Sequence, residues 1–433
     1  DVLVINTCSI RDKAEQQLYS DLGRLRDWKD ERPGRMVGVG GCVAQQVGDG
    51  ILKRFSHVDF VFGTHNLRMV PAMLEASEAG QRSLDVAEHR SLERFDFPQR
   101  HPALAGDGRG RAFVTVMEGC DMFCAFCIVP QTRGREISRS ADSILTEVRG
   151  LARAGVRDIT LLGQTVNAYG RQEERRGQGR AKGTIGFSSL LQELNQVEGL
   201  LRIRYTSPHP IFFEDSLIRA HGELEGLAPH VHLPLQSGSD RILERMRRRY
   251  TAKEYLAIVR GLRASRADIA ITTDLIVGFP GETSEDFEQT LAVVAEAGFV
   301  DQYSFKYSPR PGTSAASMGG EVPGELAQER LEELQQLQRE MTLAYHRSRV
   351  GGQAEILIDG PSRHGGGQLC GRDAHHRVVN VATSEGGAGG VPEPGDLLRV
   401  DIVEATPHSL IGVMTSPAKD RRLAVLGQAL PLA

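Results

Sequence analysis

The chain of 433 residues lacks any long apolar stretch and any strong excess of charge. No run of about 20 apolar residues is present, so we expect no helix that crosses a membrane. The formal net charge of −4 argues against a globally basic nucleic-acid binder. A local basic patch stays open, and "RMRRR" at residues 245–249 is the candidate, although a charged helix face is the simpler interpretation.

Cysteine is scarce, and an initial methionine and a secretory segment are both missing. The six thiols stand at irregular positions, 8, 42, 120, 124, 127 and 370. This spacing disfavours a disulfide framework and favours metal binding in a reducing compartment, so we expect a cytoplasmic protein. The chain opens with Asp1 and enters the apolar strand "DVLVINT" at once, from which we expect that its natural start is missing.

The order of apolar and amphipathic segments predicts an α/β protein of three domains. Residues 1–88 alternate strands and helices as in a small α/β domain, and residues 89–111 are typical of a linker. Six strands separated by helices then predict a partial, TIM-like (βα)6 barrel over residues 112–345. The expected strands are 112–117, 158–162, 202–205, 230–235, 269–277 and 302–307.

The remaining segments differ from the barrel in the length and spacing of their apolar runs. Short β-like runs separated by Gly and Pro predict a small β-barrel over residues 346–416, followed by a tail at 417–433. Residues 346–414 hold six Lys or Arg against eight Asp or Glu, which weakens the electrostatic case for RNA binding there. Residues 171–186 are rich in Gly and charge and indicate a flexible surface insertion.

The stretch "GCDMFCAFC" gathers three cysteines after the first barrel strand, where such folds place their chemistry. Cys120, Cys124 and Cys127 form a C-x3-C-x2-C loop. A cluster of four irons and four sulfides needs four outer ligands, so three thiolates would leave one iron open to an external ligand. Structural zinc is the weaker alternative, because paired C-x2-C spacing is absent and the nearest histidines, at 101 and 209, are remote. Three unrelated buried thiols are weaker still.

This loop resembles the signature of the radical S-adenosylmethionine enzymes. Other motifs, in the order found in methylthiotransferases, extend the resemblance over nearly the whole chain. They are "NTCSIRDKAE" (6–15), "GGCVAQQ" (40–46), "MEGCDMFCAFCIVPQTRGREISR" (117–139), "LPLQSGSDRIL" (233–243) and "IVGFPGET" (276–283). Within that family, "NTCSIR" and "TRGREISR" are most similar to the tRNA enzymes that add a methylthio group to C2 of N6-isopentenyladenosine beside the anticodon.

The resemblance implies an amino-terminal cluster domain, a radical barrel and a terminal RNA-binding β-barrel called TRAM. It implies two 4Fe-4S clusters, S-adenosyl-L-methionine and tRNA, with separate cytosolic electron and sulfur donors and a monomeric enzyme. The C-x3-C-x2-C loop would hold the catalytic cluster, and Cys8 and Cys42 would ligate an auxiliary one. The family's third auxiliary ligand lies upstream of Asp1, so we expect an incompletely ligated auxiliary cluster and an incomplete enzyme. Cys370 matches no family ligand.

Glycine-rich and polar turns after other strands add candidate residues. We expect Gln164, Gly278 and Glu282 to contact S-adenosylmethionine, whereas turns with local side-chain bonds are the simpler interpretation. Three arginines follow the cysteine loop and could bind a substrate carboxylate or phosphate, or form a solvated basic loop. They are Arg133, Arg135 and Arg139.

Two other functions stay open. The same chemistry could act on an aspartate of ribosomal protein S12 or on threonylcarbamoyladenosine in tRNA. A non-catalytic iron-sulfur electron carrier or RNA-binding protein would not cleave S-adenosylmethionine, but it would need neither a 200-residue barrel nor an open iron.

Overall fold

A computed structural model describes residues 1–9, 12–88, 95, 108, 110–171, 183–362, 367–382 and 392–417. Most of the expected linker, insertion and tail lies outside these ranges. The chain divides into two compact units, each built from segments that are distant in sequence. The first comprises Asp1–Gln99, Met117–Arg139 and Ser308–Met318, and the second Arg100–Val116, Ser140–Tyr307 and Gly319–Ala433. The cysteine loop therefore belongs to the amino-terminal unit, and domain boundaries near residues 88, 112 and 346 stay a prediction.

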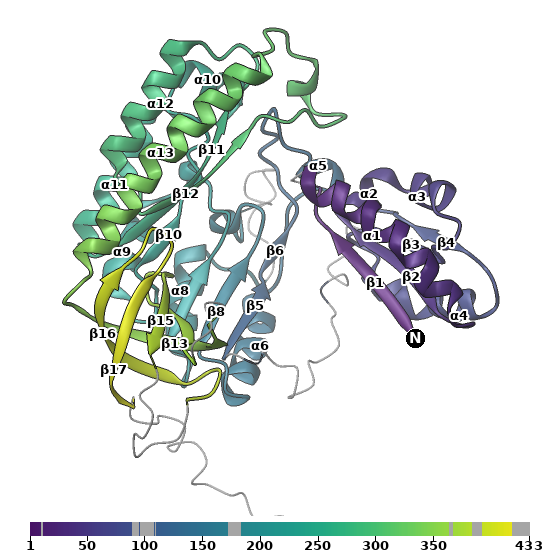
Figure 1. Cartoon of the computed structure of the whole chain (residues 1–433), viewed down its shortest axis with the longest axis horizontal. Helices are drawn as coiled ribbons and strands as arrows, with labels where there is room; N and C mark the ends of the chain where they lie inside the picture. Colours follow the sequence, from purple (N-terminus) through teal and green to yellow (C-terminus); the bar gives the residue numbers. More distant parts are fainter. Residues whose placement is uncertain are drawn as a thin grey trace, which may run out of the picture. The chain divides into compact units, whose positions relative to one another are not determined.

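The first unit is built on a parallel sheet with the strand order β1-β2-β3-β4 (Figure 1). Glycines in β2 let aromatic side chains lie flat across it, because a Cβ at Gly38 would lie 2.3 Å from the ring of Phe60. The ring of Phe60 stacks on that of Phe62, with 6.2 Å between centroids. The elements are β1 Val2–Thr7, α1 Asp12–Asp30, β2 Met36–Gly41, α2 Cys42–Val47, α3 Asp49–Arg54, β3 Phe60–Phe62, η1 Leu67–Met69, α4 Val70–Glu78 and β4 Ser83–Asp85.

The same unit contains the cysteine loop and a later segment. The loop lies between two short antiparallel strands, β6 and β7, and the later segment forms a single 3-10 turn. These elements are β6 Met117–Glu118, α5 Val129–Thr132, β7 Ile137–Ser138 and η6 Ser314–Ser317.

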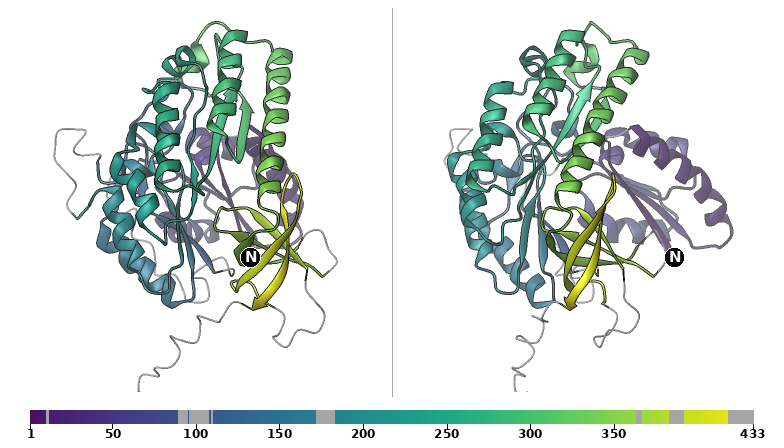
Figure 2. Two further views of the ribbon diagram at one scale, coloured as in Figure 1. Left: turned by 90° about the vertical axis from the view of Figure 1, so that its left-hand side faces the viewer. Right: turned by 60° about the vertical axis from the view of Figure 1, so that its left-hand side comes forward.

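The second unit contains the six predicted barrel strands, all in parallel pairing. They form the sheets β5-β8-β9 and β10-β11-β12, and a bridge between Ile203 and Leu227 joins the two. Helices lie along one face of the strands, as Figure 2 shows. The elements are β5 Arg111–Thr115, α6 Ala141–Arg153, β8 Asp158–Leu162, η4 Val166–Ala168, α8 Phe187–Asn195, β9 Arg202–Tyr205, η5 Pro210–Phe212, α9 Asp215–Glu223, β10 His230–His232, α10 Asp240–Arg245, α11 Ala252–Ser265, β11 Ala270–Val277, α12 Ser284–Ala297, β12 Asp301–Lys306 and α13 Gly324–Ser348.

A closed β-barrel with the strand order β13-β14-β15-β17-β16 follows α13, which confirms the predicted small barrel. Its core is aliphatic, with Ile356, Val379, Val400 and Leu410 fully buried. The strands are β13 Gln353–Pro361, β14 Leu369–Asp373, β15 Val378–Ala382, β16 Leu397–Ala405 and β17 Leu410–Pro417. Among the described helices none is both long and apolar enough to span a membrane.

The turn between β14 and β15 packs against the amino-terminal ends of the larger barrel's strands. Arg204 donates to the carbonyl oxygens of Asp373 and Ala374, both at 3.1 Å, and to the carboxylate of Asp158, also at 3.1 Å. Arg377 in turn reaches the carboxylate of Asp301 at 3.0 Å. These contacts join the amino-terminal ends of the strands to the small β-barrel, and the buried guanidinium of Arg204 is paired with the buried carboxylate of Asp158.

Candidate functional site

The cysteine loop has a frame that only glycine permits at its base. Gly119 has a φ of 78°, and a Cβ there would lie 2.2 Å from the carbonyl oxygen of Arg135. The backbone N–H of Cys120 donates to the carbonyl of Gly134 at 3.2 Å, which closes the loop above β6 and β7. The three cysteines are thereby held on one closed loop.

Within the loop, the thiols of Cys120 and Cys124 are buried and that of Cys127 is half-buried. The backbone N–H of Met122 points at Cys120 Sγ at 3.4 Å, and the N–H of Cys127 donates to the carbonyl of Cys124 at 3.0 Å. Phe123 turns the chain between the first two cysteines with a φ of 51°. An N–H directed at sulfur stabilises a thiolate, which is the form that ligates iron.

Two of the three predicted substrate arginines pair with acidic residues in or next to this loop. Arg135 pairs with Asp121 at 2.7 Å, and Asp121 also accepts the backbone N–H of Glu136 at 3.3 Å. Arg133 lies 3.9 Å from Glu118, and Arg139 is buried. A substrate role for these arginines stays a prediction, while their observed contacts fix the loop.

Two segments brace the loop from outside. Thr64 and His65, which follow β3, donate side-chain hydrogen bonds to the carbonyls of Thr132 at 2.6 Å and Arg133 at 3.0 Å. The segment Ser308–Met318 contributes the backbone N–H of Ala315, which donates to the carbonyl of Ala125 at 2.8 Å. Because Ala125 lies between Cys124 and Cys127, this bond restrains the centre of the C-x3-C-x2-C motif.

Cys8 and Cys42 follow two neighbouring strands of the amino-terminal sheet. Thr7 of β1 and Gly41 of β2 are register partners, so the two cysteines leave the same edge of the sheet from adjacent parallel strands. Cys42 is buried and Cys8 is exposed. Thr7 Oγ1 and Ser9 Oγ, which flank Cys8, are buried and make no hydrogen bond. Unsatisfied hydroxyl groups beside two thiols fit the surroundings of a bound sulfide cluster.

The cysteines of the C-x3-C-x2-C loop also fit an iron-sulfur cluster. Among the described residues, no group of three or more His, Cys, Asp or Glu side chains could hold a single metal ion. A cluster does not require that convergence, because each thiolate binds a different iron. The donor set of three thiols, with the carboxylate of Asp121 engaged by Arg135 and the imidazole of His65 by the Arg133 carbonyl, therefore favours a cluster over zinc.

In the second unit, Gln164 lies half-buried in the loop after β8. Its neighbour Asn167 clamps the loop that follows β9: its Oδ1 accepts the N–H of His209 at 2.8 Å, and its Nδ2 donates to the His209 carbonyl at 3.0 Å. This two-point bond sets the spacing of the two loops. Gln164 is thus carried on a rigid support at the carboxyl end of a barrel strand.

The other predicted cofactor residues lie in the loop after β11. Gly278 has a φ of 71°, and its N–H donates to the carboxylate of Glu282 at 2.7 Å. Glu282 also pairs with Arg330 of α13 at 2.8 Å, and both side chains are almost completely buried. The structure therefore gives Glu282 the role of shaping this loop, and direct contact with a cofactor stays a prediction for both residues.

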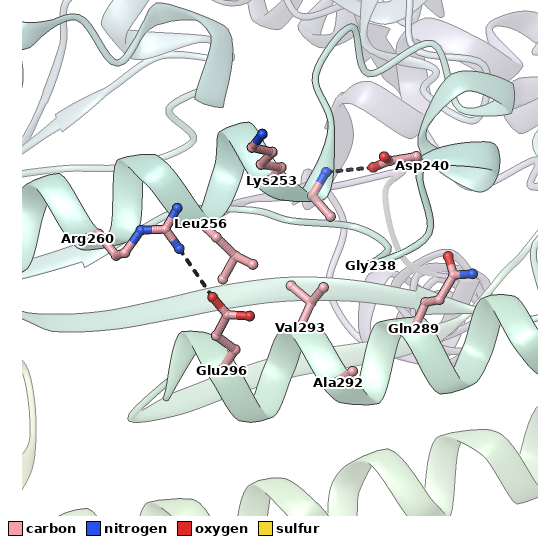
Figure 3. Close-up of a pocket in the computed structure, with 10 residues that line it drawn as sticks. Gly238, Asp240, Lys253, Leu256, Arg260, Gln289, Ala292, Val293 and Glu296 are labelled. Carbon is pink, nitrogen blue, oxygen red and sulfur yellow. Dashed lines mark hydrogen bonds and ion pairs between the residues drawn. The ribbon is translucent and has the colours of Figure 1, made fainter.

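A pocket of about 470 Å³ is lined by none of these residues. It lies between α11 and α12, where Arg260 pairs with Glu296 at 3.2 Å and Asp240 accepts the N–H of Ala252 at 2.7 Å (Figure 3). Three of its charged side chains, Arg260, Glu296 and Asp240, are thus engaged in helix-to-helix and capping bonds. Nothing in its lining matches the chemistry of the cysteine loop.

Sequence reasoning missed a polar group on the strands themselves. His232 of β10 lies 3.2 Å from the carboxylate of Asp274 on β11 and makes an edge-to-face contact with Tyr303 of β12, 5.9 Å between centroids. The sequence does carry a signal for this group, because a histidine and an aspartate interrupt apolar strands. Such polar side chains are stable inside a barrel only where its interior is accessible to water.

Comparisons with known proteins agree with this geometry. The Radical SAM superfamily model matches residues 114–294, and the model described as Uncharacterized protein family UPF0004 matches residues 1–63. The tRNA-2-methylthio-N(6)-dimethylallyladenosine synthase of Acidithiobacillus ferrooxidans is 46% identical over 428 residues, which cover 98% of this chain and 91% of that protein. The proteins of the same name from Geobacter metallireducens and Burkholderia cenocepacia are 47% and 43% identical, over 95% and 98% of this chain and 89% and 91% of their own lengths.

The chain belongs to this methylthiotransferase family. It is accordingly a radical S-adenosylmethionine enzyme, which works with S-adenosylmethionine and an iron-sulfur cluster. Its fold is shared with the methyltransferase TsrM of Kitasatospora setae, with a TM-score of 0.53 at 14% identity, covering 83% of this chain and 68% of that one. The assignment of Cys120, Cys124 and Cys127 as the ligands of the iron-sulfur cluster stays a prediction.

Proposed function

We propose that this enzyme adds a methylthio group to C2 of N6-dimethylallyladenosine in tRNA. The observation that carries the proposal is similarity along nearly the full chain to synthases named for that product, together with a C-x3-C-x2-C loop on a closed frame. Ribosomal protein S12 and threonylcarbamoyladenosine are disfavoured as substrates, because the similar proteins carry the name of the dimethylallyl enzyme.

The chain's own residues hold and orient the reactants. Cys120, Cys124 and Cys127 would hold a cluster whose open iron binds S-adenosylmethionine and supplies the one-electron cleavage that makes a carbon radical. The Met122 N–H favours the thiolate form of Cys120, and the Ala315 bond to Ala125 keeps the loop in one conformation. Orientation of the cofactor relative to C2 depends on such fixed supports, since small displacements reduce the rate strongly.

The loops after β8 and β11 carry the other residues that we assign to S-adenosylmethionine. Gln164 offers an amide donor and acceptor on the support that Asn167 and His209 stabilise. Gly278 lacks a side chain and allows a close approach to its backbone, and Glu282 fixes the loop through Arg330. We assign binding to Gln164 and Gly278, and positioning to Glu282.

Cys8 and Cys42 would ligate an auxiliary 4Fe-4S cluster at the edge of the amino-terminal sheet. Their adjacent strand ends and the buried hydroxyls of Thr7 and Ser9 support this assignment. The auxiliary cluster would hold the sulfur that is transferred. A cytoplasmic, monomeric enzyme served by separate electron and sulfur donors completes the proposal.

The test is an anaerobic turnover of the iron-reconstituted chain with S-adenosylmethionine, a reductant and dimethylallylated tRNA. Mass spectrometry would quantify 5′-deoxyadenosine and the methylthiolated nucleoside. We expect 5′-deoxyadenosine from the unaltered chain and none from Cys124→Ala, and the methylthiolated nucleoside only where the auxiliary cluster is competent. Cys370→Ala, which changes a thiol of the small β-barrel, is the matched control and should give the same products as the unaltered chain.

If the cluster is intact and neither 5′-deoxyadenosine nor the methylthiolated nucleoside forms, the radical assignment is overturned and an electron carrier is favoured. Deoxyadenosine without the methylthiolated nucleoside would overturn the assigned substrate or the auxiliary site, and repeating the reaction with S12 protein and with threonylcarbamoylated tRNA would separate the two.

A further inference from the structure

The inner face of the six-stranded barrel carries side chains that the proposed reaction has not yet used. Residues along a strand alternate between faces. In β5, Ala112 and Val114 are buried on the helix-covered side, so Phe113 points inward. In β12, Gln302 is buried and donates to the carbonyl of Leu334 in α13, so Tyr303 points inward as well.

The strand register shows which side chains are cross-strand neighbours on the inner face. Tyr303 is paired with Asp274, and Phe305 with Ile276, so these four residues lie side by side on the inner face of β11 and β12. Phe113 belongs to β5, the opposite edge strand of the six. Aromatic rings therefore line both edges of the open side of the barrel.

The aromatic side chains of this face are accessible to solvent. Phe113 is 61% exposed, Tyr303 49% and Phe305 36%. In β5 the helix-side residues Ala112 and Val114 are buried, so the exposure of that strand is concentrated on Phe113. In β12 the helix-side Gln302 is buried and Lys306 at the strand's end is exposed, while both large aromatic side chains lie on the inner face. Concentrated exposure of large aromatic rings on an inner face is costly in water and is typical of a ligand-binding surface.

Beneath the rings lies an ordered polar pair. His232 Nδ1 bonds Thr272 Oγ1 at 3.0 Å, and its Nε2 lies 3.2 Å from the carboxylate of Asp274. The imidazole is thus fixed by two partners, and the side chain of Asp274 keeps 32% exposure toward the interior. Further down, Arg204 bonds the β14–β15 turn of the small β-barrel, and Arg377 of the same turn pairs with Asp301 of β12. The inner face therefore carries one oriented carboxylate, that of Asp274, beside the exposed rings of Tyr303 and Phe305.

We propose that Phe113, Tyr303 and Phe305, together with Asp274, form the site that receives the unstacked N6-alkylated adenine and distinguishes it from unmodified adenine. The inference rests on the proposed function and assigns its substrate specificity. The adenine ring stacks on an aromatic face, the five-carbon alkyl group covers the remaining ring surface, and the carboxylate of Asp274 accepts the N6–H. An unmodified adenine stacks equally well but leaves part of the aromatic surface in water.

The experiment measures binding of the full chain to two fluorescently labelled anticodon stem-loop RNAs, one with adenine and one with N6-dimethylallyladenine. Loss of one stacking ring weakens base binding by about 5- to 150-fold for either RNA. We expect the unaltered chain to prefer the alkylated RNA. Tyr303→Ala and Phe305→Ala should each weaken binding of both RNAs, and that of the alkylated RNA more, because its alkyl group also loses the ring surface that it covers. Tyr303→Phe keeps the ring and should retain the preference.

Val350→Ala is the matched control, since Val350 is 43% exposed and lies between α13 and β13. It should leave both affinities unchanged, and unchanged thermal unfolding of all variants would show that they fold. No preference in the unaltered chain, an unchanged preference in both alanine variants, or an equal loss of affinity for both RNAs would overturn the site.

Turnover separates this inference from the reaction on which it rests. A methylthiolated product with unchanged preference in the alanine variants keeps the proposed function and overturns the base site. The opposite result is that no methylthiolated product forms, while the chain prefers the alkylated RNA and the alanine variants lose this preference. That result overturns the proposed function and supports the base site.

Discussion

The carboxylate of Glu282 joins two parts of the barrel: it accepts the N–H of Gly278 at 2.7 Å and pairs with Arg330 at 2.8 Å. Burial raises the pKa of Glu282, opposed by the Gly278 N–H and by Arg330. Glu282, which we expected to contact S-adenosylmethionine, thus holds in place the loop after β11 that we expect to contact it. Positioning of the loop and direct contact with the cofactor can be told apart, because replacing a positioning residue changes the stability of the fold as well as cofactor binding.

Glu282→Gln should destabilise the chain by about 3–5 kcal/mol, because it leaves the buried guanidinium of Arg330 without its countercharge. We also expect weaker S-adenosylmethionine binding in folded protein. Urea unfolding and equilibrium binding measure the two effects. Glu285→Gln removes an exposed carboxylate from the first turn of α12, which follows this loop, and should change neither. Weaker binding with unchanged stability would instead indicate direct contact with the cofactor.

Gly119→Ala should reduce the iron bound per chain after anaerobic reconstitution. The new Cβ would lie 2.2 Å from the Arg135 carbonyl, at a φ of 78° that L side chains rarely adopt, so the base of the cysteine loop must open. Gly150→Ala is the control, since nothing lies within 4 Å of the added Cβ in α6. It should retain full iron content and gain about 0.5–1 kcal/mol of stability. Equal iron contents would show that the frame is not needed.

The cysteine loop and the barrel strands could be predicted because their signals are local. Three cysteines lie within eight residues, and each strand is a short apolar run. The bond between Arg204 and the Asp373 carbonyl spans 169 positions, and no sequence pattern at either end indicates the other. The same holds for Ala315 and Ala125, a pair that assigns Ser308–Met318 to the unit of the cysteine loop. Long-range polar contacts depend on the assembled fold, and a single sequence does not reveal them.

Arg204→Lys should destabilise the second unit by about 2–3 kcal/mol, although the charge is retained. Arg204 bonds Asp158 and two carbonyls of the β14–β15 turn at once, and an ammonium group cannot reproduce that planar arrangement. Hydrogen exchange should show faster opening of β14 and β15 in the variant. Arg399→Lys, in β16, is the control for an arginine of the small barrel outside this contact. Unchanged exchange in Arg204→Lys would mean that the turn is held by packing alone.

His221 should make the second unit sensitive to acid. Burial, with a smaller contribution from Arg266, lowers the pKa of His221 to about 3 from its ordinary 6.5. Its Nε2 hydrogen-bonds the hydroxyl of the buried Tyr205 at 2.6 Å. Between these two pKa values the unfolded chain binds a proton that the folded chain does not, so stability is complete above pH 6.5 and falls as the pH decreases toward 3. The loss between pH 7 and pH 5 should be about 2 kcal/mol from this residue.

His221→Gln removes the titrating group and should narrow the difference in unfolding free energy between pH 7 and pH 5 by about that amount, about 2 kcal/mol, measured by urea unfolding at both values. The variant is less stable at pH 7, because the Tyr205 hydrogen bond is altered, so the pH difference and not the absolute stability is the test. Tyr205→Phe removes the same hydrogen bond but retains the imidazole, and it should keep the full pH difference. Equal differences in the unaltered chain and in His221→Gln would show that His221 is protonated in the folded protein and that burial does not hold it neutral.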